Sequence, residues 1–209
     1  MALIVQKYGG TSVGSIEKIK KVAERVLEYH KEGNQMVVVL SAMAGQTDGL
    51  IKLAYDMTDH PDPRELDVIM STGEQISIAL FAMAVKSMGF KARSLLGFQV
   101  PIHTDHLYGR ARIQEIDTNR IRQELEKDTI VTVAGFQGLD EHNNITTLGR
   151  GGSDTTAVAI AAALGADVCE IFTDVEGVYS TDPNICPRAK KMDTISYDEM
   201  LEMANNIKR

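Results

Sequence analysis

Apolar residues follow two alternating patterns along this chain. Short aliphatic runs such as Ala2–Lys7 and Met36–Leu40 are typical of strands that are buried on both faces. Between such runs lie longer segments, such as Ser15–Glu32, in which apolar residues return every three or four positions, as on one face of a helix. This alternation predicts an α/β fold with a largely parallel sheet.

The other predicted elements continue the alternation. A polar turn at Asp140–Asn144, between two short extended pieces, predicts a hairpin within Gly135–Leu148. Gly97–Arg112 is left unassigned. The remaining predicted strands are Thr129–Ala134 and Val168–Thr173, and the remaining helices are Thr47–Thr58, Arg64–Gly89 with an interruption at Ser71–Gly73, Asp117–Lys127, Gly152–Leu164 and Ser196–Ala204, the last opening with a capping box of Ser196 and Glu199.

Composition limits the class of protein. The 209 residues are 44% hydrophobic and 24% charged, which suits one globular domain. A net charge of −7 opposes non-specific binding to nucleic acid. No apolar run approaches the roughly 20 residues that span a bilayer, and Met1 leads into a strand without the marks of a signal peptide. We therefore expect a cytoplasmic protein with no nucleic-acid or membrane partner.

Potential metal ligands are sparse. Cys169 and Cys186 form no CxxC pair, and we expect them to be reduced thiols. His103, Asp105 and His106 lie close together in the sequence and invite a metal site. A zinc site usually needs three well-placed ligands, however, and such residues are more often surface polar groups. No metal ligand is therefore assigned.

Three predicted strands end in polar turns that contain glycine. Ligands of open α/β sheets bind at the carboxyl ends of strands, so chemistry is expected there. The first turn, Lys7–Ser15, carries Gly9 and Gly10, which let the backbone approach a phosphate, while Lys7 adds a positive charge. A plain tight turn explains these residues equally well, because neither the Walker A pattern nor GxGxxG is present.

The other two turns also allow two interpretations each. In Gly149–Thr156, Arg150 suits bidentate recognition of a carboxylate, whereas Ser153 or Asp154 could simply cap the following helix. Thr173–Pro183 is long enough to wrap an adenosine moiety, and it also suits a solvated turn stiffened by its proline.

Two further segments carry candidate polar groups. Ser41–Thr47 follows the second strand, and Ser71–Glu74 interrupts a helical pattern. Ser71 and Glu74 have the spacing of a capping box, so the residues alone favour a helix-capping role for Glu74.

Taken together, these segments resemble the catalytic domain of the aspartokinases, in the amino-acid kinase family. Each motif alone is modest, but six in the same order and at the family's spacing are specific. The resemblance covers Ala2 to about Ala204. The matching pieces are KYGGTSVGS at Lys7–Ser15, SAMAGQTD at Ser41–Asp48, STGEQIS at Ser71–Ser77, VAGFQG at Val133–Gly138, TTLGRGGSDTTA at Thr146–Ala157 and TDVEGVYSTDP at Thr173–Pro183.

The resemblance implies a fold and a reaction. The fold is a three-layer αβα sandwich around a mainly parallel, eight-stranded sheet. The reaction moves a phosphoryl group from ATP, with Mg²⁺, to the side-chain carboxylate of L-aspartate. Its products, aspartyl-4-phosphate and ADP, begin the route to lysine, threonine and methionine.

The resemblance also implies roles for single residues. Glu74 faces the ammonium of aspartate and Arg150 pairs with its α-carboxylate. Because the attacking carboxylate is ionised at pH 7, no general base is needed, and Asp154 is interpreted as a catalytic organiser of lysines or metal-bound water. The other substrate residues are Thr47, Gly151, Gly152 and Ser153. The ATP and phosphate set is catalytic Lys7 with Tyr8, Gly9, Gly10, Ser12, Ser41, Ser153, Thr173, Asp174, Tyr179, Ser180, Thr181, Asp182, Pro183 and Asn184.

The resemblance weakens at the end of the chain. The family pattern continues after Tyr197–Ala204 with a small-residue turn and a nucleotide-binding lysine, whereas Lys208 stands here in unmatched surroundings. We therefore expect residues 1–209 to form one kinase domain that is incomplete at its C-terminus and carries no regulatory ACT domains. Its expected partners are a second copy in a homodimer, or a missing C-terminal or regulatory chain.

Two other functions stay open. Kinases of the same fold that act on acetylglutamate, glutamate, carbamate or UMP share the glycine-rich first turn, although Glu74 with Arg150 favours a zwitterionic amino acid. The chain could also be an inactive nucleotide-binding module that needs a second chain. A Rossmann dehydrogenase is disfavoured because the dinucleotide fingerprint is missing.

Overall fold

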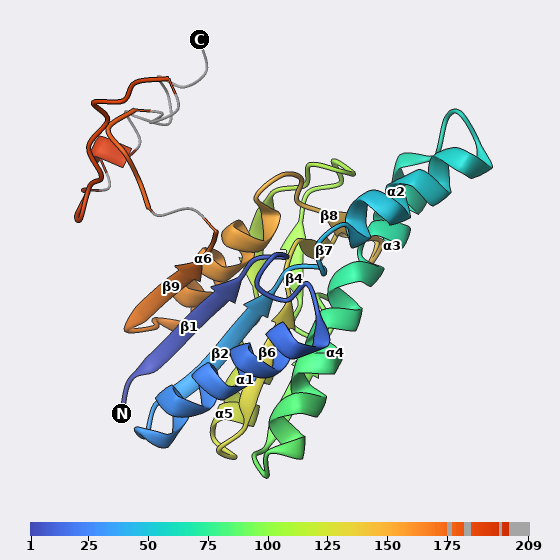
Figure 1. Ribbon diagram of the computed structural model, residues 1–209. Helices are drawn as coiled ribbons and strands as arrows, with labels where there is room; N and C mark the ends of the chain where they lie inside the picture. Colours follow the sequence, from blue (N-terminus) through green and yellow to red (C-terminus); the bar gives the residue numbers. More distant parts are fainter. Residues whose placement is uncertain (175–176, 182–184, 197, 201–209) are drawn as a thin grey trace. The chain divides into compact units, whose positions relative to one another are not determined.

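The computed structural model describes residues 1–174, 177–181, 185–196 and 198–200. The chain divides into two compact units, Met1–Asp174 and Val175–Arg209. All the labelled helices and strands belong to the first unit (Figure 1). In the second unit, the predicted capping box is confirmed: the Ser196 N–H donates to the Glu199 carboxylate at 2.8 Å, and the Glu199 N–H donates to the Ser196 hydroxyl at 3.3 Å.

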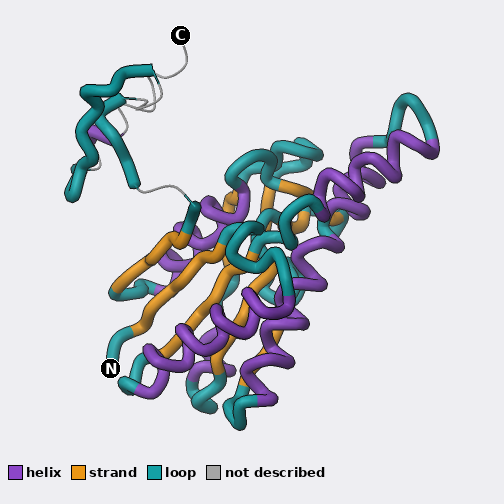
Figure 2. The backbone as a smooth tube through the Cα atoms, in the orientation of Figure 1, coloured by secondary structure: helices purple, strands orange, loops and turns teal. Residues whose placement is uncertain are grey.

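The first unit is built on a five-stranded sheet in which every neighbouring pair is parallel. Its strands lie side by side in Figure 2. Its order is β3-β6-β2-β1-β9. The central strands are nearly all aliphatic and buried, as expected for strands covered on both faces. The predicted α/β fold is therefore confirmed. The strands are β1 (Leu3–Tyr8), β2 (Gln35–Leu40), β3 (Ala92–Leu95), β6 (Ile130–Ala134) and β9 (Val168–Phe172).

Helices cover both faces of this sheet and give three layers (Figure 1). Helices α1 (Ile16–Lys31) and α4 (Thr72–Ser87) pack on one face, and α5 (Asn119–Leu125) and α6 (Gly152–Leu164) pack on the other. Successive side chains of a strand point to opposite faces. In β1, Ile4 and Tyr8 therefore join the α1 side of the core, and Val5 joins the α6 side. The same alternation brings Lys7 to the α6 side.

A second, four-stranded sheet has the order β5-β4-β7-β8. Strands β7 and β8 form the predicted hairpin around Asp140–Asn144, and the Asp140 carboxylate accepts the N–H of His142 at 2.9 Å and of Asn144 at 2.8 Å. The described strands thus form two sheets, not the single eight-stranded sheet that the resemblance implied. Phe136, with φ 70°, lies in the turn between β6 of the first sheet and β7 of the second. Its strands are β4 (Ile102–Thr104), β5 (Ile113–Ile116), β7 (Gln137–Leu139) and β8 (Ile145–Thr147).

The long helical pattern at Arg64–Gly89 is two helices, α3 (Pro63–Met70) and α4, which meet at Ser71. With α2 (Gln46–Met57), α3 forms a helical hairpin that projects beyond the carboxyl end of the central sheet (Figure 1). By length and composition alone, the continuous helical stretch Pro63–Ser87 could cross a membrane. Half of its most apolar stretch is buried inside the protein, however, as is typical of a core helix.

Candidate functional site

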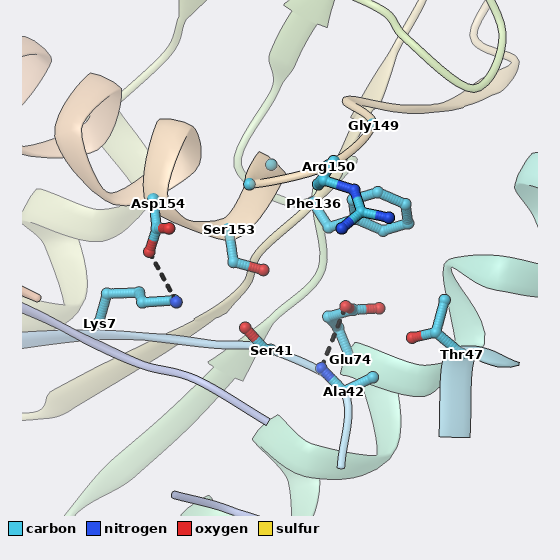
Figure 3. Close-up of a pocket in the computed structure, with 12 residues that line it drawn as sticks. Lys7, Ser41, Ala42, Thr47, Glu74, Phe136, Gly149, Arg150, Ser153 and Asp154 are labelled. Carbon is cyan, nitrogen blue, oxygen red and sulfur yellow. Dashed lines mark hydrogen bonds and ion pairs between the residues drawn. The ribbon is translucent and has the colours of Figure 1, made fainter. Parts of the chain in front are cut away.

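The carboxyl ends of the parallel strands enclose a cavity of about 280 Å³ (Figure 3). Lys7 stands at the end of β1, Ser41 follows β2, and Arg150 lies in the loop that leads into α6. The first and second glycine-bearing turns thus meet as predicted. Nine predicted site residues line the cavity: Lys7, Ser41, Thr47, Glu74, Arg150, Gly151, Gly152, Ser153 and Asp154. It is also lined by Ala42, Phe136 and Gly149.

Lys7 and Asp154 form an ion pair at one side of this cavity. The Lys7 Nζ lies 2.6 Å from the Asp154 carboxylate, and the lysine side chain is 9% exposed against 45% for the aspartate. Asp154 lies in the first turn of α6, where the helix dipole favours a negative charge. The alternative that Ser153 or Asp154 caps the helix is wrong, because the N-cap is Gly151 (φ 75°), without a side-chain hydrogen bond.

Glu74 carries a buried carboxylate with one oxygen unused. Its Oε1 accepts the N–H of Ala42 at 3.0 Å, while Oε2 is buried without a hydrogen-bond partner among the described residues. Burial raises the pKa of the Glu74 carboxyl to about 7. The favoured capping role is wrong: no side chain caps α4, and the Ser71 hydroxyl donates to the carbonyl of Val68 at 2.8 Å. Glu74 lines the cavity instead.

Arg150 points toward Glu74 from the opposite side of the cavity (Figure 3). The arginine is exposed, and no hydrogen bond or ion pair engages its guanidinium within the part of the chain that the structure describes. The site therefore holds two kinds of charge. Lys7 and Asp154 form an ion pair, whereas the Glu74 carboxyl and the Arg150 guanidinium lie on opposite sides of the cavity without pairing with each other. That separation suits a ligand with its own cation and anion.

Close backbone contacts bring these groups together. A Cβ at Gly10 would lie 2.8 Å from the carbonyl oxygen of Ala42, and a Cβ at Gly73 would lie 2.7 Å from the Ala42 side chain. The Ala44 N–H also donates to the Gly10 carbonyl at 3.2 Å. Gly10 thus has a packing role, as the tight-turn interpretation expected. This role is separate from any contact that Gly10 makes with a phosphate.

Phe136 lines the cavity and Gly135 packs against its wall, although our sequence analysis assigned neither residue a role. A Cβ at Gly135 would come 2.7 Å from the Ser153 hydroxyl, so only glycine lets Ser153 pack there. Phe136 has φ 70°, which is unusual for a bulky residue. It is held there because its N–H donates to the Thr156 hydroxyl at 3.1 Å and its carbonyl accepts from Leu148 at 2.9 Å. The VAGFQG motif marks this position, but it carries no charge that would have indicated a role.

Several residues of the predicted nucleotide set lie elsewhere. The ring of Tyr8 stacks on that of Phe172, with the ring centroids 4.6 Å apart, and is buried on the α1 face of the sheet. Only the backbone of Tyr8 is therefore placed to contribute to the Lys7–Ser15 turn. Tyr8, Ser12 and Thr173 line a second cavity of about 390 Å³. The Thr173 hydroxyl donates to the Asp174 carboxylate at 3.3 Å.

The rest of that set belongs to the second unit. Tyr179 pairs with Lys191 in an antiparallel bridge, the Ser180 N–H donates to the Lys190 carbonyl at 2.9 Å, and Thr181 is exposed. Asp182, Pro183, Asn184 and Lys208 lie outside the described residues. The roles of these residues stay predictions.

The histidine cluster has a simpler arrangement. The Asp105 carboxylate accepts the backbone N–H of Leu107 at 3.2 Å and of Arg112 at 3.1 Å, so it closes a loop. Across the described ranges, no group of three or more histidine, cysteine or acidic side chains could hold a metal ion.

Comparison with known proteins identifies the family. The model of the amino acid kinase family matches residues 2–207. The chain belongs to the amino acid kinase family. An aspartate kinase of Pseudomonas putida is 60% identical over 205 residues, which are 98% of this chain and 50% of that protein. The chain spans about half the length of the curated relatives it matches.

Solved structures agree with this assignment. The aspartate kinase of Synechocystis superposes with a TM-score of 0.83 and 50% identity, over 98% of this chain and 34% of that one. Aspartokinase III of E. coli, in complex with aspartate and ADP in its R-state, superposes with a TM-score of 0.84 and 29% identity, over 97% of this chain and 56% of that one. This amino acid kinase domain therefore has the fold of the aspartate kinases.

The raised pKa of Glu74 predicts a pH-dependent stability. Its folded pKa of about 7 exceeds the ordinary value of 4.5, so between these values the native state binds more protons than the unfolded state. The free energy of unfolding therefore falls as pH rises through this window. Glu74→Gln removes that contribution. We therefore expect the free energy of unfolding of the variant to rise relative to that of the parent chain as the pH is raised from 5 to 8.

Urea unfolding at the two pH values measures this difference. Glu65→Gln, which neutralises an exposed carboxylate in the preceding helix, is the matched control and should follow the parent chain. If Glu74→Gln also follows the parent chain, the buried carboxylate does not titrate in this range.

Proposed function

We propose that this chain is the nucleotide- and substrate-binding part of an aspartate kinase, which phosphorylates the side-chain carboxylate of L-aspartate with ATP. The observation that carries the proposal is the opposed pair of Glu74 and Arg150 across one cavity, beside Lys7. In this arrangement Glu74 would accept hydrogen bonds from the ammonium and Arg150 would bind the α-carboxylate. The side-chain carboxylate would then extend toward Lys7 and the phosphates.

This assignment satisfies the groups that the protein leaves unpaired. The unused Oε2 of Glu74 gains a cationic donor, and the guanidinium of Arg150 gains a planar acceptor for two parallel hydrogen bonds. Charge-assisted bonds of this kind contribute about 1.5–3 kcal/mol each. A ligand lacking either charge would leave one protein group unsatisfied, which is how a site rejects analogues.

Phosphoryl transfer requires little covalent chemistry from the protein. The attacking carboxylate is already ionised at neutral pH, so positioning and charge neutralisation dominate. Lys7 would neutralise charge on the transferring phosphoryl group. The hydroxyls of Ser41 and Ser153 point into the same space (Figure 3), where they would donate hydrogen bonds to phosphate oxygens. Thr173, Asp174 and the stretch from Tyr179 to Asn184 would bind the rest of the nucleotide.

Mg²⁺, when bound, would supply further neutralisation at the phosphates. Mg²⁺ is commonly held by one or two carboxylates together with phosphates and waters. Asp154 fits that role, because it is a partly exposed carboxylate at the phosphate side of the cavity. We propose that it holds the ion, through water, and orients Lys7 at the same time.

The known relatives support the choice of substrate. The relatives named above are aspartate kinases, and the E. coli protein was solved with aspartate and ADP. We propose a cytoplasmic enzyme that acts at the start of lysine, threonine and methionine synthesis. Its partner would be a second copy of the chain or the C-terminal region that its longer relatives possess.

One prediction of the proposed function concerns the acceptor. Trapping the acyl phosphate with hydroxylamine, in the presence of ATP and Mg²⁺, should give hydroxamate with aspartate but not with glutamate, acetylglutamate or no acceptor. Arg150→Ala should lower kcat/KM for aspartate about 10–200-fold, the equivalent of one charged hydrogen-bonding partner. Arg150→Lys should recover only part of this, because lysine cannot bind in a bidentate fashion.

The exposed Arg112 offers a matched control, and Arg112→Ala should retain the parent activity. A preference for another acceptor would favour one of the related kinases. No hydroxamate from a folded chain that binds ATP would favour the nucleotide-binding module that needs a second chain.

A second prediction concerns Asp154. Asp154→Asn removes the carboxylate while keeping its shape, so we expect slower turnover and a higher Mg²⁺ concentration for half-maximal rate. Titrating Mg²⁺ at saturating ATP and aspartate measures both. Unchanged turnover with unchanged Mg²⁺ dependence would contradict the role given to Asp154.

A further inference from the structure

A buried carboxylate outside the cavity joins the two segments that carry Glu74 and Arg150. Asp67, in α3, is 0% exposed. Its Oδ2 accepts the N–H of Gly109 at 3.0 Å and of Thr147 at 2.8 Å, and its Oδ1 accepts the Thr147 hydroxyl at 2.7 Å. Asp67 does not line the cavity, so the proposed reaction makes no direct use of it.

On one side, Asp67 belongs to the helix pair that presents Glu74. The N–H of Ser71 donates to the Asp67 carbonyl at 3.0 Å, and α4 begins at the next residue. Gln137 holds the same junction, because its Nε2 donates to the Ser71 carbonyl at 3.0 Å. Asp67 is thus bonded to the junction from which α4 carries Glu74 into the cavity.

On the other side, Asp67 holds the strand that leads to Arg150. Thr147 is the last residue of β8, three positions before Arg150. The Ala111 N–H donates to the Thr147 carbonyl at 2.9 Å. A Cβ at Gly149, where φ is 78°, would lie only 3.0 Å from the Gly109 carbonyl oxygen. The backbones at 109–111 and 147–149 thus pack tightly, and Asp67 accepts an N–H from each of them.

The hydrogen bonds of the cluster favour the ionised form of the Asp67 carboxyl. Both oxygens of Asp67 act as acceptors for three donors, two from the backbone and one hydroxyl. Burial raises the pKa of the Asp67 carboxyl, and these hydrogen bonds oppose that rise by stabilising the charged form. Asp67→Asn leaves one acceptor oxygen in place of two, and its NH2 group keeps a bond to Thr147 only if that hydroxyl changes from donor to acceptor.

We propose that Asp67 is a positioning residue, which fixes the separation of Glu74 from Arg150 and so sets the affinity for a zwitterionic amino acid. The proposal rests on the proposed function, because it assigns that pair of charges to one ligand. It differs from a general structural role in one respect: aspartate binding depends on it, whereas ATP binding does not.

Calorimetric titration of the whole chain tests this difference. We expect Asp67→Asn to raise the Kd for aspartate about tenfold or more while the Kd for ATP stays within about twofold. Thr147→Val, which keeps the shape but removes the hydroxyl donor, should weaken aspartate binding in the same selective way. Thr147→Ser, which restores the hydroxyl, should recover the parent affinity.

Glu124→Gln is the matched control. Glu124 is also a buried carboxylate, but it pairs with Arg120 at 3.1 Å and Lys127 at 3.5 Å, away from the cavity. It should leave both Kd values unchanged. Equal weakening of aspartate and ATP binding in Asp67→Asn and Thr147→Val, or unchanged aspartate binding in either folded variant, would overturn the proposal.

Hydrogen exchange separates this inference from the proposed function. The amides of Gly109 and Thr147 should exchange faster in Asp67→Asn than in the parent chain or in Glu124→Gln, whether or not aspartate binds. If the parent chain binds no aspartate, the proposed function fails, and the assignment of Asp67 as a determinant of substrate affinity fails with it. Faster exchange would then support only the claim that Asp67 holds the backbones at 109–111 and 147–149 together. Unchanged exchange would contradict that claim as well.

Discussion

Parallel strands that lie side by side all end at the same edge of their sheet, and this constraint determines where the polar groups of the chain meet. The turns that leave β1, β2 and β6 are crowded into one place, together with the loop that enters α6. Side chains larger than hydrogen would prevent that crowding at Gly10, Gly73 and Gly135, where a Cβ would come within 3 Å of a neighbouring atom. The glycines are thus part of how the site is assembled.

Charge within the site is only partly balanced by the protein. Lys7 and Asp154 neutralise each other at the side assigned to the phosphates. Glu74 keeps a buried oxygen without a donor, and Arg150 stays unpaired in the described part of the chain. A buried carboxylate without a full set of partners is costly, and a ligand with an ammonium and a carboxylate removes that cost. Selectivity for a zwitterion follows from what the fold leaves unsatisfied.

The sequence predicted the parts whose signals are local. Continuous aliphatic runs identified β1, β2 and β6, helical periodicity identified α1, and an alanine-rich composition identified α6. Strands β3, β4 and β5 were missed because three or four residues, interrupted by exposed positions, carry too little periodicity.

Long-range contacts explain the errors within the site. The spacing of Ser71 and Glu74 is the same whether the glutamate caps its own helix or reaches Ala42, 32 positions away. Likewise, nothing near Asp67 in the sequence indicates a bond to Thr147, 80 positions later. Glu74 was assigned to the substrate only through the family resemblance.

Binding of aspartate analogues tests the central claim most directly. Succinate lacks only the ammonium that Glu74 would bind, and β-alanine lacks only the carboxylate that Arg150 would bind. Calorimetry should find that each binds at least about tenfold more weakly than L-aspartate, since each leaves one charged group of the protein without its partner. Succinate or β-alanine binding as tightly as aspartate would contradict the assignment of these two residues to the two charges of one amino acid.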